Sequence, residues 1–399
     1  MNAAKKSIAT TKTMMAGANH RRSVAVIGGG IAGLAAALCF ARRGAHVRVF
    51  EQAQEIKEVG AGLQITPNGG VVLAALGLGA EADEMSLKAT GIEPMDALSG
   101  QRIAHFDLSN LHGQPYRLFH RADLLDILAR ACVESGVTIT TNARADEIGD
   151  THVRFSGGET VHADLIIGAD GLHSRVRPEL NGADAPFFTG QVAWRSVIRM
   201  PHAEPVARIW MAPGRHIVTY PLIGGRMNIV AVQERDDWSD EGWHYFDEPQ
   251  SVLNVFADCA PEVMDILSQV QTVRRWGLFR HPVAKHWHDG RRVILGDAAH
   301  PTLPFLAQGA NLAIEDAWVL AATCDAIEDL DLALAKYQSS RRPRVERAIG
   351  VANENARNYH LSGIKRRVAH AGLRTIGAAT PGLFLKRLDW LYDHDVTKG

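Results

Sequence analysis

The sequence has few cysteines and none of the spacings typical of disulfide frameworks or zinc sites. No C-x-x-C pair occurs, and the four residues lie far apart: Cys39, Cys132, Cys259 and Cys324. The pattern argues against a disulfide framework and against a zinc site. Because free thiols are typical of a reducing compartment, we expect a cytoplasmic protein.

The sequence also lacks an excess of charge of one sign. It has 43 Lys and Arg against 44 Asp and Glu, so that its formal net charge is −1. Without a basic excess, no overall field attracts nucleic acid or anionic lipid. Beyond the first 40 residues, no apolar run reaches the roughly 18 residues that a membrane span requires. We therefore expect neither a nucleic-acid partner nor a membrane partner.

Repeats of fixed period and low-complexity segments are absent too. The chain is 46% hydrophobic and 22% charged, which is typical of globular proteins. A length of 399 residues predicts two or three domains. Residues 1 to about 20 are polar and are expected to form a flexible tail.

A glycine-rich turn follows the first apolar run. Residues 23–27 are typical of a buried parallel strand, and the segment from Gly28 to Gly33 reads G-G-G-I-A-G. In such a turn Gly28 permits the tight bend, Gly30 lets the backbone approach a pyrophosphate, and Gly33 lets the next helix pack closely. A second expected strand, residues 46–50, ends at Glu51, about 20 residues on, where a carboxylate can bind ribose hydroxyls. The segment predicts a dinucleotide site and leaves NAD and FAD both open.

Two later segments place polar residues at the ends of expected strands. Residues 164–169 indicate a buried strand that runs into Asp170 and a loop ending at Arg177, and residues 292–296 indicate another that ends at Asp297. Open α/β sheets bind ligands at the carboxyl ends of their strands. The segment from Gln308 to Asn311 then precedes an expected helix, whose N-terminus is a further electropositive end.

With these three motifs in order, the chain resembles the single-component, class A aromatic flavoprotein monooxygenases, in the salicylate, 3-hydroxybenzoate and 6-hydroxynicotinate hydroxylase group. The resemblance covers nearly the whole chain. We expect an α/β fold with a Rossmann-like FAD domain of residues 21–182 and 281–340. A mainly β substrate domain of residues 183–280 and C-terminal helices of residues 341–399 complete it. Residues 75–105 are a candidate addition to the substrate domain.

The resemblance implies FAD as the cofactor and NADH or NADPH as the co-substrate. The glycine turn and Glu51 are implied to hold the ADP half of FAD, and Arg121 and Asp297 its middle. Asp170 and Arg177 are implied to serve both cofactors, since no second glycine fingerprint occurs. In chain order, the residues implied to contact FAD are Gly28, Gly30, Gly33, Glu51, Arg121, Asp170, Arg177, Asp297, Gly309, Ala310 and Asn311.

The chemistry that the resemblance implies is electrophilic. A flavin C4a-hydroperoxide, formed with dioxygen, transfers oxygen to an electron-rich ring, so that a phenol reacts best as a phenolate. A histidine is suited to accept the phenol proton near neutral pH. Residues 215–221 look like a strand that places His216, Val218 and Tyr220 on one face. We expect His216 and Tyr220 to act together on a substrate hydroxyl; a packed core pair is the alternative.

Four further residues are candidates for the substrate site. Gln308 and Gln64 are implied to face the substrate across the flavin ring, although both could bind backbone groups instead. Arg195 is a candidate partner for a substrate carboxylate, with a surface ion pair as the alternative, and Pro304 is implied to lie close to the flavin ring. No metal site is expected, because the histidines at 281, 286 and 288 lack a convincing carboxylate or cysteine partner.

Three functions remain open at this point. A monooxygenase is favoured, a flavin dehydrogenase or oxidase on the same fold is the rival, and a non-catalytic FAD-binding protein is the third. One departure from the broader family, Phe305-Leu-Ala307 in place of a glycine-rich form, resembles the subgroup acting on single-ring hydroxy acids and hydroxypyridines. The aromatic substrate, the choice between NADH and NADPH, and the choice between monomer and homodimer stay open.

Overall fold

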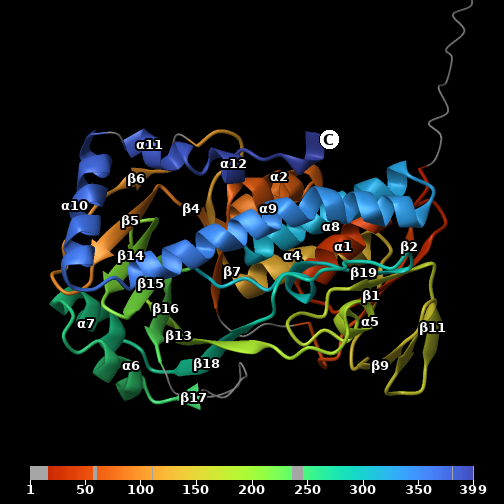
Figure 1. The fold of residues 1–399 in the computed structure, drawn as a ribbon, viewed down its shortest axis with the longest axis horizontal. Coiled ribbons are helices and arrows are strands. Elements are labelled where there is room, and N and C mark those ends of the chain that lie inside the picture. The colour runs from red at the N-terminus through yellow and green to blue at the C-terminus, as the bar shows by residue number, and fades with distance from the viewer. Residues whose placement is uncertain (1–16, 57–60, 110, 236–245, 380, 399) are drawn as a thin grey trace, which may run out of the picture.

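Two sheets at opposite ends of the molecule carry its architecture (Figure 1). The computed structural model describes residues 17–56, 61–109, 111–235, 246–379 and 381–398. The long helix α9, Leu330–Tyr359, crosses from one sheet to the other. Residues far apart in the sequence therefore meet where the two sheets approach each other.

The first sheet is parallel, with strand order β19-β12-β1-β2-β8. All residues of β12 and all but one of β1 are buried, as expected for strands covered on both faces. Helix α1, Ile31–Ala41, packs against α4, Arg121–Glu134, and against α8, Gly309–Ala326. The strands are β1 Ser23–Ile27, β2 His46–Phe50, β8 Thr138–Thr140, β12 Leu165–Gly168 and β19 Arg292–Ile294.

Two small antiparallel sheets are formed by chain segments that lie between strands of the parallel sheet in the sequence. One has the order β11-β10-β9 and the other the order β3-β7-β4. The strands are β3 Gly62–Ile65, β4 Ser86–Lys88, β7 Arg117–His120, β9 Ala145–Ile148, β10 His152–Phe155 and β11 Thr160–His162. The short helices α2 Pro67–Ala75, α3 Gly79–Glu84 and α5 Arg177–Asn181 belong to the same part of the chain.

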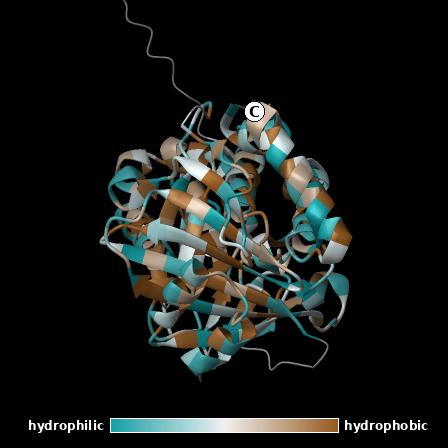
Figure 2. Ribbon diagram, turned by 90° about the vertical axis from the view of Figure 1, so that its left-hand side faces the viewer, coloured by the Kyte–Doolittle hydropathy of each residue, from teal (hydrophilic) through white to brown (hydrophobic). Residues whose placement is uncertain are grey.

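The second large sheet has eight strands in the order β17-β18-β13-β16-β15-β14-β5-β6. All of its pairs are antiparallel except β14 with β5. Figure 2 views this end of the molecule and shows apolar stretches running through the strands. The strands are β5 Gly91–Asp96, β6 Phe106–Asp107, β13 Phe187–Arg199, β14 Val206–Ala212, β15 Arg215–Leu222, β16 Arg226–Glu234, β17 Phe246–Asp247 and β18 Val273–Arg280.

The two faces of this eight-stranded sheet pack against different elements. One face, with Ile217 and Ile229, joins a core with α6, Pro249–Val255, and α7, Pro261–Ser268. The other face, with Val230 and Val232, packs against Leu303, Phe305 and Ala356. This second face is therefore turned toward the loop before α8 and toward α9, as the two-residue period of a strand requires.

The C-terminal section is helical. Helix α9 packs along α8, and the chain then continues through α10 Gly363–Ala379, α11 Pro381–Lys386 and α12 Asp389–Tyr392. Helix α10 ends at Ala379 and α11 begins at Pro381. Two 3₁₀ turns, η1 Gly296–Ala298 and η2 Val396–Lys398, complete the elements.

The α/β fold expected from the sequence is confirmed. Strands β5 and β6, from the region 75–105 and just beyond it, pair within the eight-stranded sheet, and the expected boundary at residue 340 lies inside α9. Of the expected tail, residues 1–16 lie outside the described residues, whereas Asn19 is buried and donates from Nδ2 to the carbonyl of Ala321 at 2.9 Å. In the described part of the chain, no helix combines the length and apolar character needed to cross a membrane.

Candidate active site

The glycine turn after β1 leaves room in front of the N-terminus of α1. Gly28 has φ +106°, and a Cβ there would lie 2.4 Å from the carbonyl oxygen of Ala169. A Cβ on Gly33 would lie 1.9 Å from the oxygen of Gly28, which explains why the helix needs glycine at that position. A Cβ on Gly30, in contrast, would meet nothing within 4 Å. Gly30 therefore borders open space at a helix N-terminus, where a phosphate is electrostatically favoured.

Glu51 lies directly against this turn. Its Oε2 accepts a hydrogen bond from the backbone N–H of Gly29 at 2.7 Å, and its Oε1 accepts one from Ala53 at 2.8 Å. The two bonds fix the carboxylate at the end of β2, beside the N-terminus of α1. This is the position from which it could accept hydrogen bonds from a ribose.

Arg121, directly after β7, and Asp297, shortly after β19, carry opposite charges. Burial lowers the pKa of Arg121, and Asp297 opposes the shift. Burial likewise raises the pKa of Asp297, against the influence of His300 and Arg121. Asp297 is nevertheless exposed to solvent, so a bound molecule could reach it.

These features fit FAD. Glu51 would hold the adenosine ribose, the α1 N-terminus at Gly30 the pyrophosphate, and Arg121 and Asp297 the charged and hydroxylated middle of the cofactor. The implied contacts of Gly309 and Ala310 fall at the N-terminus of α8, where both residues are partly exposed. Each of these individual contacts stays a prediction.

Asp170 and Arg177 lie in a loop that is bonded to itself and to the Asp297 turn. Asp170 accepts hydrogen bonds from Ser174 Oγ and from the N–H of Arg175, both at 2.6 Å. The Arg177 guanidinium donates to the carbonyls of Ala298 and Pro282 at 3.1 and 2.9 Å. In this structure Arg177 therefore positions the turn that carries Asp297, and a direct cofactor contact from it stays a prediction.

A pocket of about 700 Å³ opens beside this loop. Its lining combines basic, acidic and imidazole side chains, among them His173, Arg175, Glu179, Asp184 and His281. His281 contacts Asp184 Oδ2 at 3.1 Å and the carbonyl of Leu172 at 3.2 Å. These two contacts hold the His281 side chain within the packing of this loop.

The expected substrate face lies on β15. His216 and Tyr220 are 1% and 3% exposed, whereas Val218, between them on the same face, is only half-buried. His216 and Tyr220 are four residues apart, which separates their Cα atoms by roughly 13 Å along a strand. Their joint action on one hydroxyl therefore stays a prediction; a single aromatic ring lying over Val218 is a second arrangement that would contact both.

Tyr220 belongs to a tightly packed polar group. A Cβ on Gly62 would lie 2.7 Å from both the Tyr220 hydroxyl oxygen and Asn228 Cγ. Burial raises the pKa of Tyr220, although Arg195, Gln64 and Asn228 oppose the shift, so the phenol stays protonated near neutral pH. The Asn228 side chain interacts with the Tyr220 hydroxyl and accepts from the backbone N–H of Gly62 at 2.6 Å, so it belongs to the same polar group.

Arg195 presents a positive charge to this group. Its guanidinium lies 4.6 Å from the ring centre of Trp276. Burial and the neighbouring Arg121 lower the pKa of Arg195 to about 10, and Tyr220 opposes the shift. An anionic ligand at this position would offset the cost of holding two guanidinium groups close together.

Gln64, Gln308 and Asn311 are held by other protein groups. Gln64 Oε1 accepts a hydrogen bond from the Tyr116 hydroxyl, and Gln308 Nε2 donates to Thr66 Oγ at 3.0 Å. Asn311 donates to the carbonyls of Gln64 and Ala307, at 3.0 and 2.6 Å. Asn311 therefore ties the β3 segment to the loop before α8. Pro304 in that loop is exposed.

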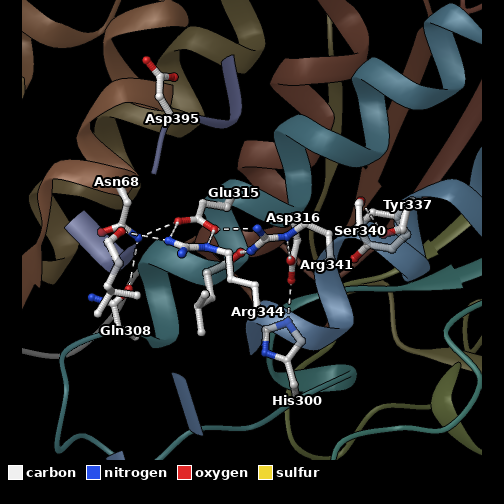
Figure 3. A network of polar contacts seen from close by, with 12 residues as sticks. Asn68, His300, Gln308, Glu315, Asp316, Tyr337, Ser340, Arg341, Arg344 and Asp395 are labelled. Atoms are coloured by element: carbon white, nitrogen blue, oxygen red, sulfur yellow. Dashed lines mark hydrogen bonds and ion pairs between the residues drawn. The ribbon is translucent and has the colours of Figure 1, made fainter. Parts of the chain in front are cut away.

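A buried ionic network lies behind Gln308 (Figure 3). Gln308 Oε1 accepts from Asn68 Nδ2, which also donates to Glu315. Arg341 contacts Glu315 at 2.6 Å and Asp316 at 2.7 Å, and Asp316 contacts His300 Nε2 at 2.5 Å. Arg344 also pairs with Glu315 at 2.8 Å. The network therefore couples α8 to α9, to Asn68 in α2 and to His300 in the segment after η1.

We expect this network to contribute stability that disappears in acid. Burial alone would raise the pKa of Asp316, but His300 and Arg341 outweigh burial and hold it at about 2. Since an unfolded aspartate has a pKa near ~4, this contribution is complete above about pH 4 and is lost as the pH falls toward 2. Asp316→Asn should lower the free energy of unfolding at pH 7 by about 3 kcal/mol. It should also make the free energy of unfolding depend less on pH below about pH 4.

Urea unfolding between pH 2 and 7 measures this effect. The matched control is Asp126→Asn, which removes an exposed carboxylate paired with Arg130 in the same helix. It should change the free energy of unfolding by less than about 0.5 kcal/mol. Equal effects of the two substitutions would contradict the importance assigned to the buried network.

The fold and these sites define a flavoprotein, with a dinucleotide turn on one sheet and a polar face on a second sheet beside it. Comparison with known proteins specifies the family. Residues 21–352 match the model described as FAD binding domain. The chain is 34% identical over 393 residues to a 3-amino-4-hydroxybenzoate 2-monooxygenase of Streptomyces platensis, covering 94% of this chain and 96% of the relative.

Other relatives agree. The chain is 34% identical to 3-hydroxybenzoate 6-hydroxylase of Klebsiella oxytoca, with coverage of 92% and 95% of the two chains. It is 31% identical to 6-hydroxynicotinate 3-monooxygenase of Bordetella bronchiseptica, with coverage of 83% and 91%. The structure of Klebsiella pneumoniae HpxO with FAD and uric acid superposes with a TM-score of 0.81 at 25% identity, covering 95% and 97%. The chain therefore belongs to the FAD binding domain family and is a class A, FAD-dependent aromatic monooxygenase, as its three motifs indicated.

Proposed function

We propose that the enzyme hydroxylates a small phenol-like aromatic or N-heteroaromatic ring, consuming NADH or NADPH and dioxygen. The observation that carries the proposal is the face of β15, where His216 and Tyr220 flank half-buried Val218 opposite the loop before α8. Relatives named for hydroxybenzoate and hydroxynicotinate hydroxylation support this substrate class. The four cysteines are buried thiols, in keeping with the cytoplasmic location that we infer.

Bound FAD would supply the redox chemistry: reduction by the nicotinamide and activation of dioxygen for electrophilic transfer to the ring. The protein's part is to bind the ring, orient it and remove its hydroxyl proton. Apolar side chains, including Val218, Val230 and Phe305, line the face on which the ring would lie. They exclude water from the reacting atoms.

The two ends of the ring would meet different groups. At one end, the Arg195 guanidinium and the Tyr220 hydroxyl suit a carboxylate or another acceptor. At the other end, His216 would accept the hydroxyl proton. Burial and then the neighbouring His360 lower the pKa of His216 well below its ordinary value. His216 is therefore neutral near pH 7 and available as a base.

A substrate screen tests this function. The FAD-loaded enzyme is mixed with NADH or NADPH and 3-hydroxybenzoate, 3-amino-4-hydroxybenzoate or 6-hydroxynicotinate. We expect at least one ring to stimulate nicotinamide oxidation and to yield a product heavier by one oxygen atom, in a yield close to the nicotinamide consumed. A dehydrogenated product without added oxygen would instead indicate a flavin dehydrogenase or oxidase.

The role of Arg195 gives a separate prediction. Arg195→Met keeps the length of the side chain and removes its charge, so carboxylate-bearing rings should bind about 10- to 100-fold more weakly, the scale of a charged hydrogen bond. Dissociation constants from flavin absorbance changes measure this with 3-hydroxybenzoate and, as a ligand control, with resorcinol, which lacks the carboxylate. An equal loss of affinity for both compounds would assign Arg195 to packing.

A further inference from the structure

A chain of three titratable side chains leads from the substrate face to the protein surface. His216 Nδ1 lies 2.7 Å from His360 Nε2, and His360 Nδ1 lies 2.8 Å from Glu234 Oε1. His216 is 1% exposed and the His360 side chain 2%, whereas the Glu234 side chain is 52% exposed. His216 lies on β15, His360 directly follows α9, and Glu234 ends β16, so only the fold brings them together.

The glutamate determines where the protons of both imidazoles lie. A carboxylate accepts hydrogen bonds, so His360 must carry its proton on Nδ1. In a neutral imidazole the other nitrogen then accepts, and His360 Nε2 can only receive the proton that His216 carries on Nδ1. His216 Nε2, on the ring edge turned away from His360, is consequently left as an acceptor. The chain thus holds His216 in the tautomer that a base requires.

The surroundings keep both histidines neutral. Among the described residues, the charged and titratable groups that face His360 are His216 from β15 and Glu234 from β16. The backbone N–H of Gly214 donates to the His360 carbonyl. The ring of His216 lies 5.3 Å from that of Phe305 and 5.2 Å from that of Tyr359, between ring centres. Burial lowers the pKa of both histidines. An imidazolium held at His216 would therefore be costly.

We propose that His216, His360 and Glu234 form a proton relay that carries the substrate hydroxyl proton to solvent, with His360 and Glu234 as positioning and relay residues behind the catalytic His216. The proposal rests on the proposed function. The substrate O–H bond breaks as the proton moves to His216 Nε2. The Nδ1 proton of His216 moves to His360 Nε2, and the Nδ1 proton of His360 moves to Glu234 Oε1. Each histidine changes tautomer and stays neutral, the ring becomes a phenolate, and Glu234 releases the proton to water.

The tautomers can be tested without substrate. The FAD-loaded enzyme is labelled with ¹⁵N-histidine. The ring-nitrogen signals of His216 and His360 are assigned by their loss in His216→Ala and His360→Gln. Between pH 6 and 8 we expect both imidazoles to be neutral with the proton on Nδ1, and Glu234→Gln, whose amide can donate as well as accept, to weaken this preference at His360. A charged His360, or a proton on Nε2 of His216, would overturn the relay. Because no substrate is present, this result is independent of the proposed function.

Turnover tests the transfer itself. With whichever of the three screened rings is hydroxylated fastest, Glu234→Gln and His360→Gln should hydroxylate about tenfold or more slowly near pH 7, with unchanged FAD content and substrate affinity. Added imidazole or formate should restore part of the rate in the variants and none in the wild type. The matched control is Glu134→Gln, an exposed carboxylate at the end of α4, which should behave as wild type.

Two results would contradict the relay in these turnover experiments. One is wild-type hydroxylation by both variants with an unchanged pH profile. The other is a loss of rate that accompanies lost FAD or lower stability and does not respond to imidazole or formate, since that would assign His360 and Glu234 to folding alone. Failure of all three rings to stimulate nicotinamide oxidation, with the tautomers as expected, would contradict the proposed function instead.

Discussion

Gly30→Val should give a folded protein that purifies without FAD and is colourless. The backbone at Gly30 has φ −75° and ψ −177°, which valine can adopt, and a Cβ there meets no protein atom within 4 Å. The added side chain would instead occupy the space in front of the α1 N-terminus and keep a pyrophosphate from the backbone N–H groups. Losing two charge-assisted hydrogen bonds costs about 3 kcal/mol, or about a hundredfold in affinity.

Two other glycines supply the controls for this experiment. Gly350→Val, at an exposed position of α9 with equally open surroundings, should leave FAD binding unchanged. Gly33→Val should fail to fold, because its Cβ would lie 1.9 Å from the Gly28 oxygen. Flavin absorbance and circular dichroism distinguish the three outcomes. Stoichiometric FAD in purified Gly30→Val would remove the turn from the cofactor site.

His216→Ala should lower hydroxylation about a hundredfold or more, the scale of a positioned base. Nicotinamide oxidation should then leak to hydrogen peroxide, since an unactivated ring accepts oxygen poorly. The pKa of His216 is held low by burial and by His360, so the wild-type rate should persist to a pH below the ordinary histidine value of ~6.5. In the variant this titration should disappear, and added imidazole should restore part of the rate.

Tyr220→Phe tests the other end of the ring and should lower hydroxylation by roughly one to three powers of ten. Its matched control is Tyr359→Phe, which removes a half-buried hydroxyl that donates to the Phe305 carbonyl at 3.4 Å. Product per nicotinamide consumed, with peroxide counted in parallel, measures all three variants. Wild-type rate and coupling in both His216→Ala and Tyr220→Phe would make these residues core packing.

Local patterns carried much of what the sequence predicted. The glycine turn, the strand ending at Glu51 and the shared face of His216 and Tyr220 each depend on neighbouring residues, and strand or turn geometry places them without tertiary information. The shared face alone leaves the joint action on one hydroxyl a prediction, because the rise along the strand separates the two Cα atoms by roughly 13 Å. Distance within an element mattered as much as the shared face.

The parts missed from the sequence depend on contacts between distant segments. His360 meets His216 across 144 positions, and Arg341 meets Asp316 across 25, with no periodic pattern to signal either contact. Asn228 was missed because a buried amide in a strand has no distinguishing spacing. The departure at Ala307 has a physical consequence as well: this alanine has φ +54°, a conformation that favours glycine and is held here by the Asn311 side chain.

Oxygen incorporation tests the central claim most directly. The FAD-loaded enzyme is allowed to turn over its best ring from the substrate screen with NADH or NADPH under ¹⁸O₂ in ordinary water, and the aromatic product is analysed by mass spectrometry. We predict one ¹⁸O atom in each product molecule and about one product per nicotinamide consumed. A product that contains oxygen from water, or that is oxidised without gaining oxygen, would contradict a monooxygenase.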